Sequence, residues 1–298
     1  MNGVLPIDKP EGWTSFDVIR KLRHPLMERS IGHLGTLDPM ATGVLVLLLG
    51  NATKAASILE DDDKVYEAEI LLGTETDTED VTGTVLRERP VDISEETFRE
   101  TAASFIGPYQ QIPPMMSAKK QGGRKLYELA RKGIETERKP EKRMIHSLEI
   151  LSVTLPEARF RVHVSKGTYV RSLCRDIGNA LKTGGTMKSL RRLRQGRFDL
   201  AGCQTLDEVL SKVNDGTVSE IVIPTEELFS EMPVFTVSKD SERFLRNGNV
   251  LRGEDFEGAV PAIPDGTNVR IRGAENVFRA VYRYDAGTDT FKVVKMFL

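Results

Sequence analysis

The hydrophobic pattern of the chain alternates between two kinds of segment. Apolar and polar residues that alternate, and short unbroken apolar runs, predict strands. Apolar residues that recur every three or four positions behind a capping residue predict helices. In the first 200 residues the expected strands are 3–8, 44–49 (a strand or the start of a helix), 64–72, 84–87, 143–154 and 159–165. The expected helices are 14–22, beginning at Thr14 or Ser15, then 94–105, 126–132, 171–181 and 205–210.

Turn-forming residues separate these elements. Glycine and proline interrupt 31–42, and threonine, acidic residues and glycine fill 73–83, so both segments are expected to be loops. The segment 107–125 is rich in glycine, proline and lysine and is predicted to be an exposed loop. A turn at 155–157 joins the two strands on either side of it.

The pattern changes after residue 230. Pro224 and Pro233 bracket a linker, and behind it come short strands at 235–237, 269–271, 280–284 and 291–297. Short strands at such spacing are typical of a small β-barrel. A chain of 298 residues exceeds the usual size of one domain, so we expect a large domain over 1–230 and a small one over 231–298.

Composition narrows the class of protein. With 39% hydrophobic and 29% charged residues, the chain has the make-up of an ordinary globular protein. Its longest apolar run, 44–49, is too short to cross a bilayer, and its N-terminus lacks signal-peptide features, so a cytoplasmic protein without a membrane partner is expected. Two cysteines without a CxxC pair, and four histidines without zinc-like spacing, indicate neither a disulfide framework nor a structural metal.

Charge is segregated along the chain although the net charge is only -2. Residues 119–143 hold ten basic and four acidic side chains, and residues 161–197 hold ten basic and one acidic. In contrast, 57–101 holds 15 acidic and four basic side chains, and 201–298 holds 16 and 11. This distribution predicts a basic face that can bind nucleic acid. The alternative is that the charges simply lie on helix faces exposed to water.

The segment 32–43, GHLGTLDPMATG, is the most informative for chemistry. Asp38 lies between glycines and a proline, which constrain the backbone and hold the side chain in one orientation. A nucleophile is compatible with this setting. Taken alone, however, Asp-Pro is more often a turn initiator.

Six sequence blocks, in order, resemble those of the tRNA pseudouridine synthase B (TruB) family of the bacterial stand-alone type. Besides 32–43 they are KPEGWTS (9–15), KVY (64–66), TDTEDVTG (76–83), QIPPMMSAKK (111–120) and SKGTYVRSL (165–173). The resemblance covers roughly residues 3–197. It implies an α+β pseudouridine synthase fold, with a mixed, largely antiparallel sheet flanked by helices and a PUA-like C-terminal barrel.

The resemblance also implies roles for single residues. Asp38 is similar to the family's nucleophile, which attacks either C6 of the base or C1′ of the ribose. Tyr66 resembles the tyrosine that stacks on the target base, and strand packing is its plain alternative. Arg171 corresponds to the arginine that pairs with the catalytic carboxylate and keeps it ionised.

The remaining expected site residues are assigned to substrate binding. Leu190 resembles a leucine that walls the uracil pocket, and His33 a histidine that fills the space of the flipped nucleotide. The basic segment 107–145 resembles an insertion that clamps the T arm of tRNA, so its lysines are expected to contact phosphate. The lysines expected to bind substrate are Lys9, Lys64, Lys119 and Lys120.

The resemblance thus implies isomerisation of uridine to pseudouridine at position 55 of tRNA. It implies no metal or organic cofactor, no obligate protein partner and a monomer. Three alternatives remain: the RNA-guided branch of the superfamily, a non-catalytic RNA-binding module, and a hydrolase. A hydrolase needs a second carboxylate, for which Asp77 or Asp80 can be nominated. The branch that acts in a complex is disfavoured because no lysine-rich terminal extension precedes the catalytic blocks.

Overall fold

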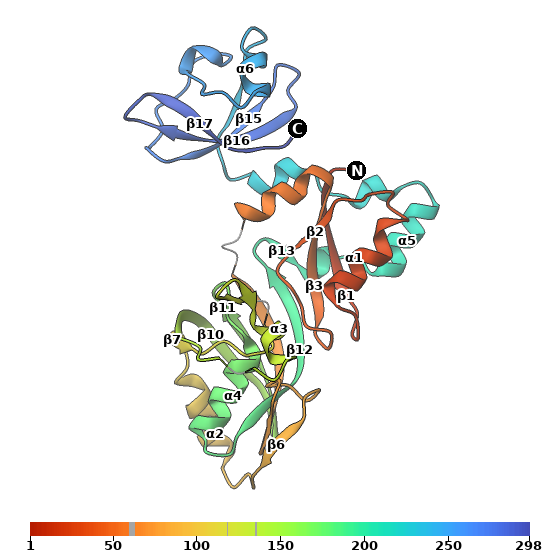
Figure 1. Cartoon of the computed structure of the whole chain (residues 1–298), viewed down its shortest axis with the longest axis vertical. Helices are drawn as coiled ribbons and strands as arrows, with labels where there is room; N and C mark the ends of the chain where they lie inside the picture. The colour runs from red at the N-terminus through yellow and green to blue at the C-terminus, as the bar shows by residue number, and fades with distance from the viewer. Residues whose placement is uncertain (60–62, 118, 135) are drawn as a thin grey trace.

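Two sheets lie one beyond the other along the axis of an elongated molecule (Figure 1). The computed structural model describes residues 1–59, 63–117, 119–134 and 136–298. Within these residues a nine-stranded sheet occupies the first two thirds of the chain, and a four-stranded sheet lies near the C-terminus. The α+β class with a mixed, largely antiparallel sheet is confirmed.

The large sheet has the order β1-β3-β12-β4-β11-β10-β7, with β2 paired to β3 and β13 paired to β12. All its pairings are antiparallel except that of β12 with β3. Its strands are β1 (Gly3–Lys9), β2 (Ile31–Leu34), β3 (Thr42–Leu49), β4 (Lys64–Leu72), β7 (Gly107–Gln111), β10 (Glu141–Thr154), β11 (Glu157–Val164), β12 (Gly185–Gln195) and β13 (Phe198–Asp199).

Helices cover the large sheet and bury its main apolar core. The helices α1 and α5 lie beside β1 and β3, whereas α2 and α4 pack against the part formed by β4, β10, β11 and β12 (Figure 1). As expected, Thr14 caps α1, where it forms a capping box, and Ser94 caps α2 by accepting from Thr97 N. Thr205 also forms a capping box, at the start of α5. These helices are α1 (Ser15–Arg23), α2 (Glu95–Ala103), α4 (Val170–Ala180) and α5 (Leu206–Asn214).

Three segments differ from the sequence-based expectation. The predicted loop 31–42 begins with strand β2, and the predicted loop 107–125 begins with β7. In each case pairing with a neighbouring strand satisfies backbone groups in spite of the glycines. Strand β12 was not expected, because its lysines and arginines hide an alternating pattern. It lies at the centre of the sheet, between β3 and β4.

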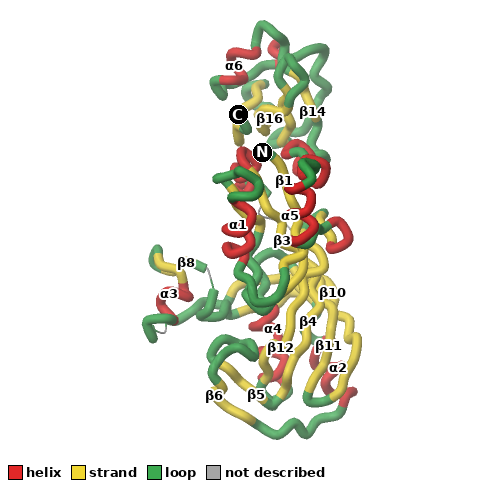
Figure 2. Tube along the Cα trace, turned by 90° about the vertical axis from the view of Figure 1, so that its right-hand side faces the viewer, coloured by secondary structure: helices red, strands yellow, loops and turns green. Residues whose placement is uncertain are grey.

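The basic insertion forms a small arm. Strands β8 (Lys120–Gln121) and β9 (Arg124–Lys125) pair with each other and lead into helix α3 (Leu126–Ala130). Figure 2 shows this arm projecting from the body of the molecule. A second small hairpin, β5 (Thr74–Thr76) with β6 (Val85–Glu88), carries the acidic loop between its strands.

The C-terminal region is an open sheet with the order β14-β15-β16-β17, so the expected closed barrel is not confirmed. Two isolated bridges, Val237–Phe256 and Leu251–Phe291, connect the segment 251–256 to the two edges of this sheet. They do not add a strand. The elements are β14 (Val234–Thr236), α6 (Glu242–Arg246), β15 (Asn268–Arg272), β16 (Phe278–Asp285) and β17 (Thr290–Met296).

A separate apolar cluster joins the C-terminal sheet to the large domain. Ala55, from the 3-10 helix η1 (Gly50–Ser57), packs with Phe229, Val281 and Phe297. The remaining 3-10 helices are η2 (Leu200–Gly202), η3 (Val218–Ile221), η4 (Thr225–Phe229) and η5 (Gly253–Asp255). In the described part of the chain, no helix combines the length and apolar character that a bilayer span requires.

Candidate active site

A cleft of about 1070 Å³ opens where the β2–β3 loop meets β4, β12 and the first turn of α4. Asp38 is the one carboxylate among the described residues that line this cleft. The cations Lys64, Arg131 and Lys166 also line it. A cleft with several cations around a single anion is suited to a polyanionic ligand.

Asp38 is held by Arg171 from α4. The Nε of Arg171 lies 2.9 Å from Oδ2 of Asp38, and its Nη2 donates to Oδ1 at 3.2 Å. The arginine is buried, whereas one third of the Asp38 side chain remains accessible to solvent. This two-point contact fixes the orientation of the carboxylate and leaves it reachable from the cleft.

The environment changes the proton affinity of Asp38. Burial raises the pKa of Asp38 above the ordinary value of an aspartate, and the nearby Asp80 carboxylate raises it further. The Arg171 guanidinium opposes both effects. A carboxylate whose anionic form is poorly solvated is a stronger nucleophile than one in water, and Arg171 keeps that form present.

The block 9–15 supports the loop that carries Asp38. Lys9 has no exposed surface, and its ammonium donates to the carbonyls of Pro10 (2.9 Å), Trp13 (2.6 Å) and Pro39 (3.2 Å). Burial lowers the pKa of Lys9 to about 8. The Oγ of Ser15 accepts a hydrogen bond from Leu37 N at 3.0 Å. Lys9 was expected to bind substrate; in this structure all three of its donated protons are used on carbonyls inside the protein, one of them in the loop that carries Asp38.

Two residues missed by sequence reasoning hold the other side of this loop. Arg192 is buried and donates to the carbonyls of Val44 at 2.6 Å and Gly35 at 3.1 Å. Gln195 donates to the Leu34 carbonyl. The strands approach closely here, since a Cβ added to Gly43 would lie 2.2 Å from the Arg192 carbonyl oxygen. The alternating pattern of β12 was the signal that could have identified Arg192 as buried.

Two further sequence blocks, 76–83 and 111–120, converge on Arg171. Its Nη1 donates to the Thr78 carbonyl at 3.0 Å, and its Nη2 to the Met116 carbonyl at 2.9 Å. Asp80 is buried with Oδ2 3.9 Å from Arg171 Nε, and its Oδ1 accepts from Thr82 N at 3.0 Å. The blocks at 76–83 and 111–120 therefore build the setting of the guanidinium.

The hydrolase alternative is not supported by this arrangement. Neither Asp77 nor Asp80 lines the cleft. Asp77 accepts a hydrogen bond from Thr84 N at 2.8 Å, and Asp80 lies beside the arginine that holds Asp38. Without a second carboxylate facing Asp38 across the cleft, the geometry of a glycosidase is absent from the described residues.

Three expected side chains line the cleft around Asp38. Tyr66 on β4 and Leu190 on β12 are buried apart from their cleft-facing surface. His33 on β2 also lines the cleft, and its Nδ1 has no hydrogen-bond partner among the described groups. Burial lowers the pKa of His33, and the Arg192 charge lowers it further, so a neutral ring is favoured.

The expected lysine contacts lie in two places. Lys64 lines the cleft itself. Lys119, in the arm, pairs with Glu141, which also pairs with Arg143. Lys120 begins strand β8. From the arm, Tyr127 and Arg131 also line the cleft, with the guanidinium 5.3 Å from the ring centroid of Tyr127.

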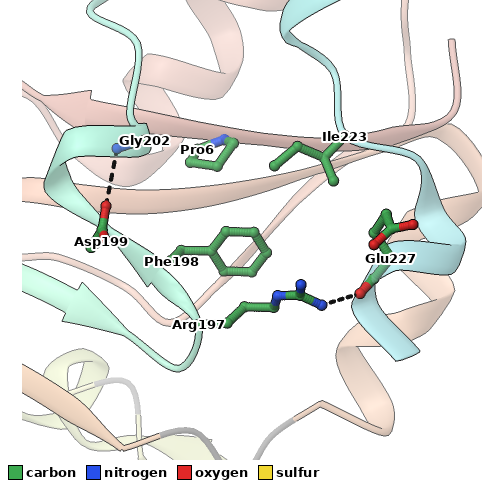
Figure 3. Close-up of a pocket in the computed structure, with 7 residues that line it drawn as sticks. All are labelled: Pro6, Arg197, Phe198, Asp199, Gly202, Ile223 and Glu227. Carbon is green, nitrogen blue, oxygen red and sulfur yellow. Dashed lines mark hydrogen bonds between the residues drawn. The ribbon is translucent and has the colours of Figure 1, made fainter. Parts of the chain in front are cut away.

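A second, smaller pocket of about 230 Å³ lies away from Asp38 (Figure 3). Arg197, Phe198 and Asp199 contribute to it from the β12–β13 region, and Glu227 from η4. Arg197 donates to the Glu227 carbonyl and, at 2.7 Å, to Ser230 Oγ. These hydrogen bonds of Arg197 join the β12–β13 region to the linker. We therefore assign the pocket a structural role.

Comparisons with known proteins agree with the site. The chain matches the models described as TruB family pseudouridylate synthase (N terminal domain) at residues 23–170 and tRNA pseudouridylate synthase B C-terminal domain at residues 171–230. The tRNA pseudouridine synthase B of Lachnoclostridium phytofermentans is 46% identical over the whole of both chains. That of Clostridium kluyveri is 45% identical, covering 86% of this chain and 87% of its own.

A solved structure supports the fold. A chain in the crystal structure of a Cbf5-Nop10-Gar1 complex superposes with a TM-score of 0.74 at 26% identity, covering 99% of this chain and 85% of that one. The relatives named tRNA pseudouridine synthase B are much more similar in sequence than this member of a complex. This chain belongs to the TruB family of pseudouridylate synthases.

Proposed function

We propose that this chain converts uridine to pseudouridine at position 55, in the T loop of tRNA, with Asp38 as the nucleophile. The observation that carries the proposal is the single carboxylate in a cationic cleft, held at both oxygens by Arg171. The names of its relatives, tRNA pseudouridine synthase B, support the same reaction and the same class of substrate.

The reaction is an isomerisation in which every atom stays within the uridine. The bond between N1 and C1′ breaks, a bond between C5 and C1′ forms, the proton on C5 leaves and a proton is added to N1. Asp38 attacks the sugar or the base and so divides one difficult step into two easier ones. Because no electrons are gained or lost overall, the chemistry calls for no redox cofactor, and the proposal includes no metal.

The uridine has to leave the stack of the T loop before Asp38 can reach it. In this proposal His33 occupies the space that the nucleotide vacates, and Leu190 forms a wall of the base pocket. Tyr66 stacks on the uracil and retains it while the base turns. All three line the cleft together with Asp38, which is the geometry that these roles require.

Phosphate contacts are assigned to the basic residues around the cleft and in the arm, among them Lys64, Lys119 and Lys120. The region 231–298 is proposed to be a PUA-like RNA-binding domain that extends the tRNA surface. The protein is proposed to act in the cytoplasm as a monomer, without an obligate protein partner.

The deciding experiment incubates purified protein, treated with EDTA, with an unmodified tRNA transcript and maps pseudouridine by reverse transcription after carbodiimide treatment. We expect product at position 55 from the wild type and none from Asp38→Asn. A transcript with cytidine at position 55 is the matched substrate control. Product from Asp38→Asn, or modification only at other uridines, contradicts the proposal.

A further inference from the structure

Three metal-ligating side chains meet on the face of the large sheet opposite Tyr66. Their donor atoms, one each from Asp63, His146 and His163, lie within 4.8 Å of one another. The Nε2 of His146 is 3.0 Å from Oδ2 of Asp63, and the Nε2 of His163 is 3.6 Å from the same oxygen. About a third of each side chain is exposed, so an ion from solvent has access to all three.

The backbone brings these residues together. His163 lies on β11 and pairs with Val65 of β4. The register of β10 and β11 shifts between Ile145 and Ser147, so that His146 is the extra residue of a bulge and turns toward His163. The carbonyl of Asp63 accepts a hydrogen bond from Gly196 N at 2.9 Å, which anchors the residue to the end of β12. Two of the three donors are therefore presented by paired strands, and the third precedes β4 and is held to the end of β12 by its backbone.

We propose that Asp63, His146 and His163 form a binding site for a divalent transition-metal ion of the zinc class. Two imidazole nitrogens and one carboxylate oxygen are a common ligand set for Zn²⁺, with a fourth position for water. Ligands about 2.1 Å from a tetrahedral ion lie roughly 3.4 Å apart, and the separations of 3.0 and 3.6 Å lie on either side of this value.

Neither cysteine offers a competing thiolate site. Cys174 is buried, and burial raises its pKa; burial likewise raises the pKa of Cys203 to about 12. Of the other two histidines, His24 lies on the surface after α1 and His33 faces the catalytic cleft. Spacing in the sequence gave no sign of a metal because the three ligands come together only through strand pairing.

A nearby cation provides a specific test. The Nη2 of Arg194 lies 3.5 Å from His163 Nε2, and the side chain of Arg194 is exposed. A bound cation repels this guanidinium, which then has to turn away into solvent. Removal of the Arg194 charge is expected to tighten metal binding. Removal of the imidazole of His146 or His163 is expected to weaken it.

The site lies beside the catalytic strand but outside the cleft. Asp63 directly precedes Lys64 of β4, the strand that also carries Tyr66. A metal ion would join the start of β4 to β10 and β11, and it would stabilise the folded state by an amount that grows with the logarithm of its concentration above Kd. The proposed isomerisation does not use it, so EDTA is expected to leave that activity unchanged.

The experiment uses tag-free full-length protein, Zn²⁺ in isothermal titration and Co²⁺ in absorption spectroscopy. We expect one ion per chain with micromolar affinity, d–d bands typical of tetrahedral Co²⁺, and a higher Tm with Zn²⁺ present. His146→Asn and His163→Asn are each expected to weaken binding at least ten-fold, and Arg194→Ala to tighten it several-fold. His24→Asn is the control that leaves binding unchanged.

The proposal is overturned if the wild type shows no saturable binding of one ion per chain. It is equally overturned if the double variant His146→Asn/His163→Asn binds as tightly as the wild type. The unfolding midpoint of each variant in EDTA verifies that it is folded before its metal affinity is compared.

Discussion

One guanidinium, that of Arg171, contacts both carboxylate oxygens of Asp38, at 2.9 and 3.2 Å. The same guanidinium donates to the carbonyls of Thr78 and Met116. It therefore joins the catalytic loop to two other segments of the chain that are distant in sequence. Any change at Arg171 is expected to alter both the aim and the charge of Asp38.

Arg171→Lys is predicted to lower kcat by roughly 100-fold, because an ammonium cannot reproduce the two parallel contacts and the carboxylate loses its aim. Arg171 lowers the pKa of Asp38, so weakening this contact raises that pKa further. The acid limb of the pH–rate profile is therefore expected to move to higher pH. Single-turnover rates from pH 5 to 8 measure both effects; an unshifted acid limb contradicts the assigned electrostatic role.

Asp38→Asn is predicted to abolish activity and to remove a pH-dependent loss of stability from the folded state. Burial raises the pKa of Asp38 in the folded state above its unfolded value, so the folded wild type loses stability as pH rises through that pKa. Asparagine does not titrate. Measured from pH 4 to pH 8, the difference in unfolding free energy, variant minus wild type, should therefore grow as Asp38 ionises in the folded wild type and then level off. Urea unfolding across this range measures it, and a difference that shrinks with pH contradicts the prediction.

The elements found from sequence are those in which local signals agree with the fold. Thr14 caps α1 as expected, and β4 keeps the alternating pattern that predicted it. Strand β12 was missed because lysines and arginines normally indicate a surface. Arg192 is nonetheless buried, since backbone carbonyls of β3 and of the loop that follows β2 satisfy its donors.

The candidate active site also combines features that the sequence predicts with features that only tertiary contacts determine. The blocks around Asp38 and Arg171 gave the residues but not their geometry, which depends on strand pairing and on the loops at 76–83 and 111–117. The resemblance placed Lys9 among the substrate-binding residues, whereas the structure shows the carbonyls of the turn at 10–13 folded onto its ammonium. Such contacts are tertiary and leave no trace in periodicity or spacing.

Arg192→Met is predicted to reduce kcat about ten-fold to 100-fold while the Kd for tRNA stays nearly constant. The reason is that the Gly35 and Val44 carbonyls lose their donor and the loop carrying Asp38 loses its support. Unpaired buried carbonyls should also cost about 1–3 kcal/mol of stability. Stopped-flow binding and single-turnover chemistry separate the two parameters. Arg194→Ala, an exposed neighbour, is the matched control and should leave kcat unchanged.

Glu141→Gln is predicted to strengthen tRNA binding and steepen its salt dependence. In the free protein Glu141 pairs with Lys119 and Arg143, so part of the positive charge of the arm is neutralised before RNA arrives. Releasing these cations adds phosphate contacts, and each contact contributes about -0.7 to -0.9 to the slope of log K against log salt. Lys119→Ala/Lys120→Ala should do the opposite, weakening binding and flattening the slope. Filter binding between 50 and 300 mM KCl compares the three proteins, and equal slopes exclude the arm from phosphate contact.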